Sequence, residues 1–275
     1  MSPWFETVAV CALIAVGTAL GKAFSDRPKP YWLLGYTLAL ALVGWLLLVT
    51  YNQSLHFAQL FIRIATGRAR FVILSFAVTI GLISPLSRLP RKSERLIVCT
   101  VTALIVTWFS VLPFLSSAMM ENRMRDLRTR FDSDGICIQN TAYTCAPAAA
   151  VTALARLGLP ASEGEIANLS RTNPITGTLP WSLCAALGSR YVKQGLRCRY
   201  RCFESVAQLA DAGVTLVILK DKFLSDHCVT VLAVSGDTVT VADPEIGKRS
   251  ISSEQFKKVW RFCGIVLDRK VAEAS

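Results

Sequence analysis

The residue of this sequence with the clearest potential as a nucleophile is one cysteine, Cys145. Cys145 enters a run rich in alanine and leucine that is typical of a helix, and Pro147 stands where a first helical turn tolerates proline. The unpaired amides at the start of a helix favour a thiolate over a thiol. A lone cysteine is more commonly a buried structural residue, so its interpretation depends on the partners that the rest of the sequence offers.

A base for such a thiol, and an acid that fixes the tautomer of the base, are both found downstream. His227 is the single histidine after residue 131, so it is the base that the sequence offers. It opens one predicted strand, Asp243 closes the next, and the turn residues 235–237 (Ser-Gly-Asp) join them. This hairpin sets residue 227 opposite residues 243–246, which predicts that the two side chains lie close together. The alternative is a surface hairpin with an ordinary turn acid.

A fourth candidate, Gln139, lies six residues before Cys145. A side-chain amide just before a nucleophilic cysteine can donate a hydrogen bond to a developing oxyanion, beside the backbone N–H of the cysteine itself. The predicted catalytic residues are therefore Cys145, His227, Asp243 and Gln139.

The elements that position these residues indicate a compact α+β domain with an antiparallel sheet. Runs with helical and strand-like patterns alternate between Gly and Pro breakers, and Ser162 with Glu165 forms a capping box. The predicted helices span residues 146–157, 162–169, 181–189, 204–212 and 253–259. The predicted strands span residues 200–203, 214–219, 227–234, 238–242, 248–251 and 264–267.

Four groups of residues between positions 134 and 267 follow one another in a specific order. They are Gln139-x5-Cys145-Ala146-Pro147-Ala148, His227-x-Val229, Asp243-Pro244-x-x-Gly247, and Glu254-Gln255-Phe256 with Trp260. In order and spacing they resemble the motifs of the C39 family of papain-like cysteine peptidases. In that family the domain removes leader peptides from bacteriocin precursors, usually after a double glycine, and is often fused to an ABC exporter.

The resemblance implies a role for each candidate residue and a peptide or protein as the substrate. Cys145 would be the nucleophile and His227 the base. Asp243 would orient the base, and Gln139 would donate to the oxyanion.

The sequence also departs from the family. Thr144 and Ala146 flank the cysteine where the family usually has an acidic residue and a glycine. The apolar part precedes the peptidase-like part, whereas exporter-fused members have the opposite order. Gly247 and Lys248 superficially resemble a P-loop, but Arg249 follows where Ser or Thr is required. We therefore predict no ATP binding by this chain, which leaves a separate exporter as the candidate partner.

The first 130 residues are apolar and basic. Hydrophobic residues make up 52% of the chain, and the mean hydropathy is +0.43. Residues 1–130 contain 14 Lys and Arg against 5 Asp and Glu, a net charge of +9, whereas residues 131–275 have 16 against 14, a net of +2. Basic residues between apolar spans usually flank a bilayer, and a nucleic-acid site would need them on a folded soluble face. We predict a transmembrane anchor at residues 1–130 in contact with the lipid bilayer, no nucleic-acid partner, and a C39-like peptidase domain at residues 131–275.

Four uncharged stretches predict about four transmembrane helices, at residues 7–21, 30–55, 71–87 and 96–120. A span needs roughly 20 apolar residues, so the first is short unless Trp4 and Phe5 extend it. A cleaved signal peptide fits it poorly, because no Lys or Arg precedes the apolar run. No acidic residue lies inside these spans, which favours an anchor over a transporter core. Residues 56–70 are amphipathic, and His56 within them is interpreted as incidental.

The remaining cysteines leave alternatives open. Two of the nine, Cys11 and Cys99, lie in predicted spans. Besides Cys145, the other six permit three disulfides with fifteen connectivities, and buried thiols are the alternative. Zinc at Cys198 and Cys202 is disfavoured, because residues so spaced on one strand are too far apart to share a metal comfortably, and we predict no metal and no cofactor. The six are Cys137, Cys184, Cys198, Cys202, Cys228 and Cys263.

The side of the membrane is predicted from charge and from the cysteines. Lys22, Arg27 and Lys29 follow the first span while no basic residue precedes it, and four spans place both ends of the chain on one side. The positive-inside rule then places the peptidase domain of this inner-membrane protein in the periplasm or outside the cell, and six spare cysteines agree with an oxidising compartment. The full count of flanking basic residues is tied at seven on each side, and exporter-fused relatives in the C39 family work on the cytoplasmic side.

Two other functions use the same residues. One is a catalytically idle peptidase-like domain that binds a leader peptide, although such a copy has no reason to keep all four candidate residues. The other is a thiol-dependent amidase or acyltransferase with a non-peptide substrate, because only the cleft around the triad would differ.

Overall fold

The computed structural model describes residues 3–28, 30–51, 59–221 and 226–270, and the chain forms two compact units. The first unit comprises Met1–Met119 and the second Met120–Ser275. His56 lies outside the described residues, so the structure does not bear on its predicted incidental role.

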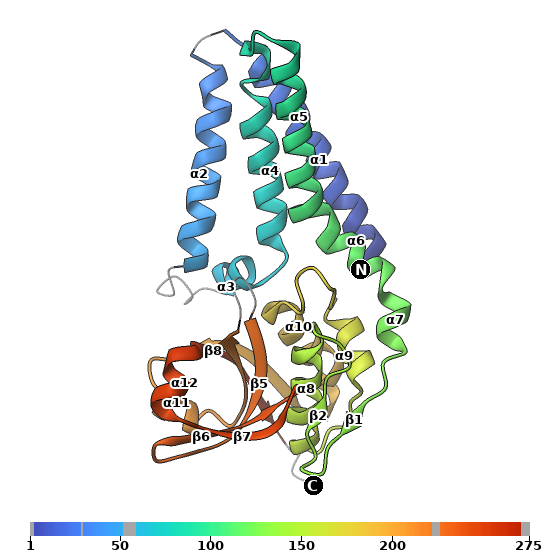
Figure 1. Cartoon of the computed structure of the whole chain (residues 1–275), viewed down its shortest axis with the longest axis vertical. Coiled ribbons are helices and arrows are strands. Elements are labelled where there is room, and N and C mark those ends of the chain that lie inside the picture. The colour runs from blue at the N-terminus through green and yellow to red at the C-terminus, as the bar shows by residue number, and fades with distance from the viewer. Residues whose placement is uncertain (1–2, 29, 52–58, 222–225, 271–275) are drawn as a thin grey trace. The chain divides into compact units, whose positions relative to one another are not determined.

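Among its described residues, the first unit has four helices that are long and apolar enough to cross a membrane, as the sequence predicts. They span Pro3–Ser25, Trp32–Thr50, Ala69–Arg88 and Lys92–Met119, with mean hydropathies from 1.8 to 2.2. Trp4 and Phe5 belong to the first helix, which therefore has 23 residues and meets the length requirement. The elements in Figure 1 are α1 (Pro3–Ser25), α2 (Trp32–Tyr51), α3 (Gln59–Thr66), α4 (Ala69–Ile83), η2 (Leu86–Arg88), α5 (Lys92–Val106), the π-helical turn η3 (Thr107–Val111) and α6 (Leu112–Met119).

Helix α4 is the centre of this unit, because α1, α2, α3 and α5 all contact it. Glycines permit the close approach of the backbones. A Cβ atom at Gly17 would lie 2.3 Å from Thr79 Oγ1, and one at Gly81 would lie 2.8 Å from the Cβ atom of Ala39. Small residues at such contacts are typical of membrane helices, whose association depends on close packing.

One ion pair ties three elements of the first unit together. Glu6, which the sequence places before the first span, lies within α1 and pairs with Arg68 at the start of α4. Arg68 Nη2 also donates to the carbonyl oxygen of Pro113 at 2.8 Å and to Ser117 Oγ at 2.7 Å, both on α6. A charge among apolar helices is costly unless it is paired, so Arg68 offsets the acidic group inside α1.

The second unit is built on a six-stranded antiparallel sheet of order β3-β8-β4-β5-β6-β7 (Figure 1). Strands β4 to β7 follow one another as neighbours, and β8 returns between β3 and β4. A separate pair of short strands, β1 and β2, was not predicted, because two residues each carry no periodic pattern. The strands are β1 (Arg130–Phe131), β2 (Cys137–Ile138), β3 (Leu196–Cys202), β4 (Val214–Lys220), β5 (Asp226–Ser235), β6 (Thr238–Asp243), β7 (Gly247–Ser252) and β8 (Trp260–Arg269).

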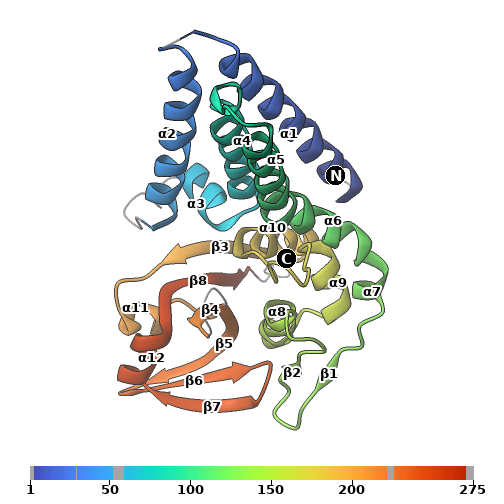
Figure 2. The ribbon, with the colours of Figure 1, turned by 45° about the horizontal axis from the view of Figure 1, so that its top comes forward.

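Helices cover both faces of the sheet. One group lies on one side and α11 and α12 lie on the other, each group over its own buried apolar cluster (Figure 1 and Figure 2). The helices are α7 (Glu121–Arg125), α8 (Cys145–Arg156), α9 (Glu163–Leu169), α10 (Pro180–Tyr191), η4 (Val192–Gln194), α11 (Val206–Ala210) and α12 (Ser253–Val259), with α8, α9 and α10 forming the first group.

Three predicted boundaries need correction. The strand predicted at residues 264–267 is the longer β8, which runs from Trp260 to Arg269. The strand predicted at residues 200–203 begins earlier, at Leu196, because its alternation of buried and exposed residues starts there. The helix predicted at residues 204–212 is the shorter α11. Ser205 is its N-cap, since its hydroxyl accepts a hydrogen bond from the backbone N–H of Gln208 at 3.3 Å.

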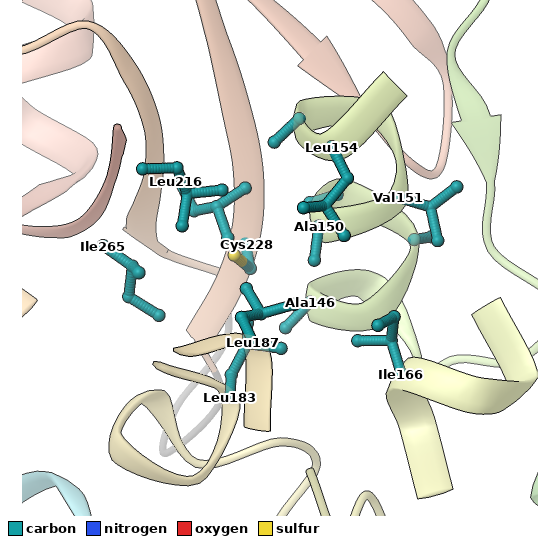
Figure 3. Packing of buried hydrophobic residues seen from close by; sticks show 14 of the residues in the cluster. Ala146, Ala150, Val151, Leu154, Ile166, Leu183, Leu187, Leu216, Cys228 and Ile265 are labelled. Carbon is teal, nitrogen blue, oxygen red and sulfur yellow. The ribbon is translucent and has the colours of Figure 1, made fainter. Parts of the chain in front are cut away.

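Small side chains let α8 lie close to the sheet. Figure 3 shows Ala150 and Leu154 of α8 directed toward Cys228 and Leu216 on the strands. Alanine presents only a methyl group, so the backbone of the helix can approach the strands without leaving a void. The fully buried alanines of this helix are Ala148, Ala149, Ala150 and Ala153.

Two buried hydrogen bonds fix the position of α8. Thr230 Oγ1 on β5 donates to the carbonyl oxygen of Ala149 at 2.7 Å, and the N–H of Cys137 on β2 donates to Thr152 Oγ1 at 2.9 Å. The helix is therefore tied to β5, the strand that also carries His227.

Candidate active site

The helix α8 begins at Cys145, which is partly buried. A hydrogen-bonded turn precedes it: Thr144 Oγ1 accepts from the N–H of Thr141 and donates to the carbonyl oxygen of Thr141, both at 3.1 Å. Thr144 is fully buried. Its hydroxyl thus organises the turn at the position where the sequence departs from the acidic residue of the C39 motif.

The imidazole of His227 lies between two side chains. His227 Nε2 is 2.8 Å from Asp243 Oδ1, and Cys145 lies close enough to the same ring to raise the pKa of His227. The structure therefore brings together three of the four predicted residues as a chain from Cys145 through His227 to Asp243.

The charges of these groups reinforce one another. Burial lowers the pKa of His227, but the hydrogen bond to Asp243, the nearby Cys145 and the charges of both groups outweigh it and raise the pKa from 6.5 to about 10. Burial raises the pKa of Asp243, but the hydrogen bond from His227 and the N–H of Glu245 outweigh it, and the net pKa is lowered. At neutral pH the arrangement therefore holds a protonated imidazole against a carboxylate.

The register of the β5–β6 hairpin explains how the two side chains meet. Thr230 pairs with Ala242, so extending this register by three residues sets 227 opposite 245, inside the predicted range. Asp243 is then a diagonal neighbour of His227, a geometry that long side chains can bridge. A bulge between Val231 and Ala233 shifts the pairing and was not predicted.

The turn from Asp243 to Gly247 serves two purposes. Asp243 Oδ1 accepts the N–H of Glu245 at 3.0 Å, which fixes the carboxylate, and Arg249 Nη1 lies 3.5 Å from Oδ2. The carbonyl oxygen of Pro244 accepts the N–H of Gln139 at 2.9 Å. The same turn therefore holds both the acid and the backbone of the fourth predicted residue.

Gly247 is required by this turn. Its φ of +87° lies in the left-handed region that favours glycine. A Cβ atom there would also lie 2.9 Å from Asp132 Oδ2. The glycine of the Asp-Pro-x-x-Gly motif is thus explained by backbone geometry.

The side-chain amide of Gln139 has unused hydrogen-bonding capacity. Its Oε1 is buried and, within the described part of the chain, has no hydrogen-bond partner. A buried polar atom without a partner is rare in a folded protein and calls for a functional or structural explanation.

The part of the chain that carries this site is similar to known proteins. The profile of the Peptidase_C39 like family matches residues 135–265. An uncharacterized protein of Methanothermobacter marburgensis is 30% identical over 146 residues, which are 53% of this chain and 96% of that protein. This chain belongs to the Peptidase_C39 like family. A second uncharacterized protein, from Methanothermobacter thermautotrophicus, is 28% identical over 143 residues, 52% of this chain and 94% of that protein.

Two solved structures are similar to the C39-like domain. One is the peptidase domain of Streptococcus ComA, a bifunctional ABC transporter, with 21% identity and a TM-score of 0.43 over 48% of this chain and 96% of that one. The other is a double glycine motif protease from an AMS/PCAT transporter in complex with the leader peptide, with 16% identity and a TM-score of 0.42 over 53% of this chain and 96% of that one.

All nine cysteines are free thiols in the structure. Burial raises the pKa of Cys137 and of Cys263 to about 12, so these two thiols are poor nucleophiles at neutral pH. Cys184 Sγ on α10 and Cys198 Sγ on β3 lie 2.9 Å apart, as neighbouring thiols. The described residues of the C39-like domain contain no group of three or more His, Cys, Asp or Glu placed to hold a metal.

Two residues beside the site were missed by the sequence reasoning. Glu163 is fully buried and accepts hydrogen bonds from Asn140, the residue after Gln139. In the sequence Glu163 looks like an ordinary first-turn acid of a helix, and no spacing rule connects it to a loop 23 residues away. Only the folded structure reveals this contact.

Proposed function

We propose that this chain is a membrane-anchored cysteine peptidase that cleaves a peptide or leader-peptide substrate. The observation that carries the proposal is the position of the His227 imidazole between Cys145 and the buried carboxylate of Asp243. In this position the pKa of His227 is raised to about 10. A protonated imidazole beside a sulfur atom is the arrangement that supplies a thiolate nucleophile and a proton for the leaving group.

In the acylation step the sulfur of Cys145 attacks the carbonyl carbon of the scissile peptide bond. The oxygen of the tetrahedral intermediate accepts hydrogen bonds from Gln139 Nε2 and the backbone N–H of Cys145. His227 gives its proton to the leaving amine as the C–N bond breaks, and a thioester remains on Cys145. Asp243 keeps the ring oriented throughout.

In the deacylation step the neutral imidazole of His227 takes a proton from water. The hydroxide attacks the thioester, the C–S bond breaks, and the acid product leaves. The site then returns to the thiolate and imidazolium pair. No metal or organic cofactor takes part in these steps.

The four apolar helices of the first unit supply the anchor in this proposal. We place the peptidase domain on the extracytoplasmic side of the membrane, on the charges after the first helix. A separate exporter would deliver a leader-peptide substrate of the bacteriocin type, because Arg249 rules out a P-loop at Gly247.

The proposal is tested with the full chain in detergent or nanodiscs and a diverse peptide library, with products identified by mass spectrometry. We expect cleavage at a defined sequence that iodoacetamide abolishes. Labelling of Cys145 without cleavage of any peptide would refute the peptidase and favour an idle binding domain or an enzyme that acts on other acyl groups.

A further inference from the structure

A buried carboxylate contacts the loop between β2 and α8, residues 139–144, which we call the Gln139 loop. Glu163 is the first residue of α9 and has no solvent-exposed surface. A buried carboxylate is costly unless its oxygens accept hydrogen bonds. Within the described part of the chain, no Lys or Arg forms an ion pair with Glu163, so hydrogen bonds alone must offset its burial.

Both carboxylate oxygens of Glu163 accept hydrogen bonds from a single residue, Asn140. Oε1 accepts the backbone N–H of Asn140 at 2.9 Å, and Oε2 accepts a hydrogen bond from Asn140 Nδ2. Nδ2 also donates to the carbonyl oxygen of Arg128 at 2.7 Å. Charge-assisted bonds to two donors of one residue fix both its peptide plane and its side chain.

Glu163 itself cannot shift easily. Its own N–H donates to Thr129 Oγ1 at 2.9 Å. A Cβ atom at the next residue, Gly164, would lie 2.5 Å from the carbonyl oxygen of Met124, so the helix start is pressed against the end of α7. Ser162 caps the helix by accepting the N–H of Glu165 at 3.2 Å.

The peptide groups on either side of Gln139 are therefore held from two directions. Its own N–H is bound by the carbonyl oxygen of Pro244, in the turn that carries Asp243. The next N–H, of Asn140, is bound by Glu163. The side chain of Gln139, whose buried Oε1 has no partner among the described residues, is oriented by these two backbone contacts.

We propose that Glu163 is a positioning residue that fixes the Gln139 amide for the oxyanion. This inference rests on the proposed function, because it assigns Glu163 a role through the oxyanion donor. Replacement by Gln keeps the shape but turns one acceptor into a donor that faces Asn140. The glutamine side chain cannot accept from both the backbone N–H and Nδ2 of Asn140, so one of the two contacts becomes repulsive and the Gln139 loop shifts.

The test compares two reactions of the same thiol in the full chain. Acylation of Cys145 by p-nitrophenyl acetate forms a thioester, releases p-nitrophenolate and passes through an oxyanion. Alkylation by iodoacetamide displaces iodide and forms no oxyanion. The Cys145→Ala chain gives the background from other thiols in both assays.

We expect Glu163→Gln to slow acylation by about 10- to 100-fold, since a misplacement near 1 Å can have this effect. Its alkylation rate should stay unchanged. Gln139→Ala should slow acylation on the order of 10²–10³-fold, and adding Glu163→Gln to it should have little further effect, because both act through one amide. Glu165→Gln is the matched control: it removes a charge from the same helix, from a surface pair with Arg190, and should leave both rates unchanged.

A Glu163→Gln chain that is acylated at the wild-type rate would overturn the inference. So would a double variant, Glu163→Gln with Gln139→Ala, whose loss of acylation rate equals the product of the two single losses. If Glu163→Gln does not fold, Asn140→Ala takes its place. This change keeps the backbone bond to Glu163 and removes the side-chain bond, so a smaller, non-additive loss is expected. These rates are measured without a peptide, so failure of the proposed peptidase activity and failure of this inference are separate results.

Discussion

At the scale of single residues, the charge on His227 connects structure to chemistry. With a pKa near 10 the ring carries a proton at neutral pH, which is the proton that a leaving amine requires. The buried carboxylate of Asp243 keeps this ring in place, because it is itself fixed by the N–H of Glu245. The raised pKa of His227 and the lowered pKa of Asp243 also make the stability of the fold depend on pH.

The direction of that dependence follows from linkage. The folded-state pKa of His227 is raised, so its contribution to the free energy of unfolding is complete below pH 6.5 and is lost as the pH rises toward about 10. The folded-state pKa of Asp243 is lowered, so its contribution is present above pH 3.8 and is lost as the pH falls through the lower folded value. We expect the melting-temperature difference between wild type and Asp243→Ala to be largest at about pH 4–6.5. A difference that stays constant from pH 3 to 10 would contradict these assignments.

Asp243→Asn separates orientation from stability. The amide can donate to Nε2, which favours the wrong imidazole tautomer, so turnover should fall by about 10⁴-fold while the fold is retained. Turnover and thermal melting of the Asn and Ala variants are compared. If both variants melt at lower temperature and keep the wild-type rate, Asp243 only terminates β6.

At the scale of elements, what the sequence predicts depends on how local the signal is. The β5–β6 hairpin was predicted because its turn residues, 235–237, are contiguous. Its register was predicted only as a range, since the bulge near Leu232 has no sequence signal. The contact of Glu163 with Asn140 joins segments 23 residues apart and depends on how α9 packs, so no local pattern reveals it.

The close packing of α8 gives a prediction at this scale. Ala150 is fully buried against the sheet, so Ala150→Leu should overpack the core and reduce the free energy of unfolding by about 1–3 kcal/mol. It should also slow turnover, because α8 carries Cys145 and would move away from His227. Ala185→Leu, at an exposed position of α10, is the control and should change neither quantity. Equal effects of the two substitutions in urea unfolding would show that α8 does not need small residues.

At the scale of the whole molecule, the two-part organisation could be predicted because charge and hydropathy change over long segments. The net charges of +9 and +2 for the two parts and the four long apolar stretches each depend on many residues, so a change at one residue barely affects them. The folded chain divides between Met119 and Met120 into two compact units. The family match over residues 135–265 lies wholly within the second unit.

The side of the membrane is the prediction that belongs to this scale. Alkaline phosphatase fused after residue 275 should be active and green fluorescent protein at the same place should be dark, because the charges after the first helix favour an extracytoplasmic C-terminus. The opposite pattern would place the peptidase domain in the cytoplasm. It would also remove the oxidising compartment in which disulfides among the spare cysteines could form.

The central claim, that Cys145 is the nucleophile of a peptidase, is tested most directly by turnover of the Cys145→Ala chain on a peptide that the wild type cleaves. We expect turnover to fall to background with an unchanged melting temperature, because the side chain is small and only partly buried. Cys202→Ala, at another partly buried cysteine, should keep the wild-type rate. Wild-type turnover by the Cys145→Ala chain would contradict the account.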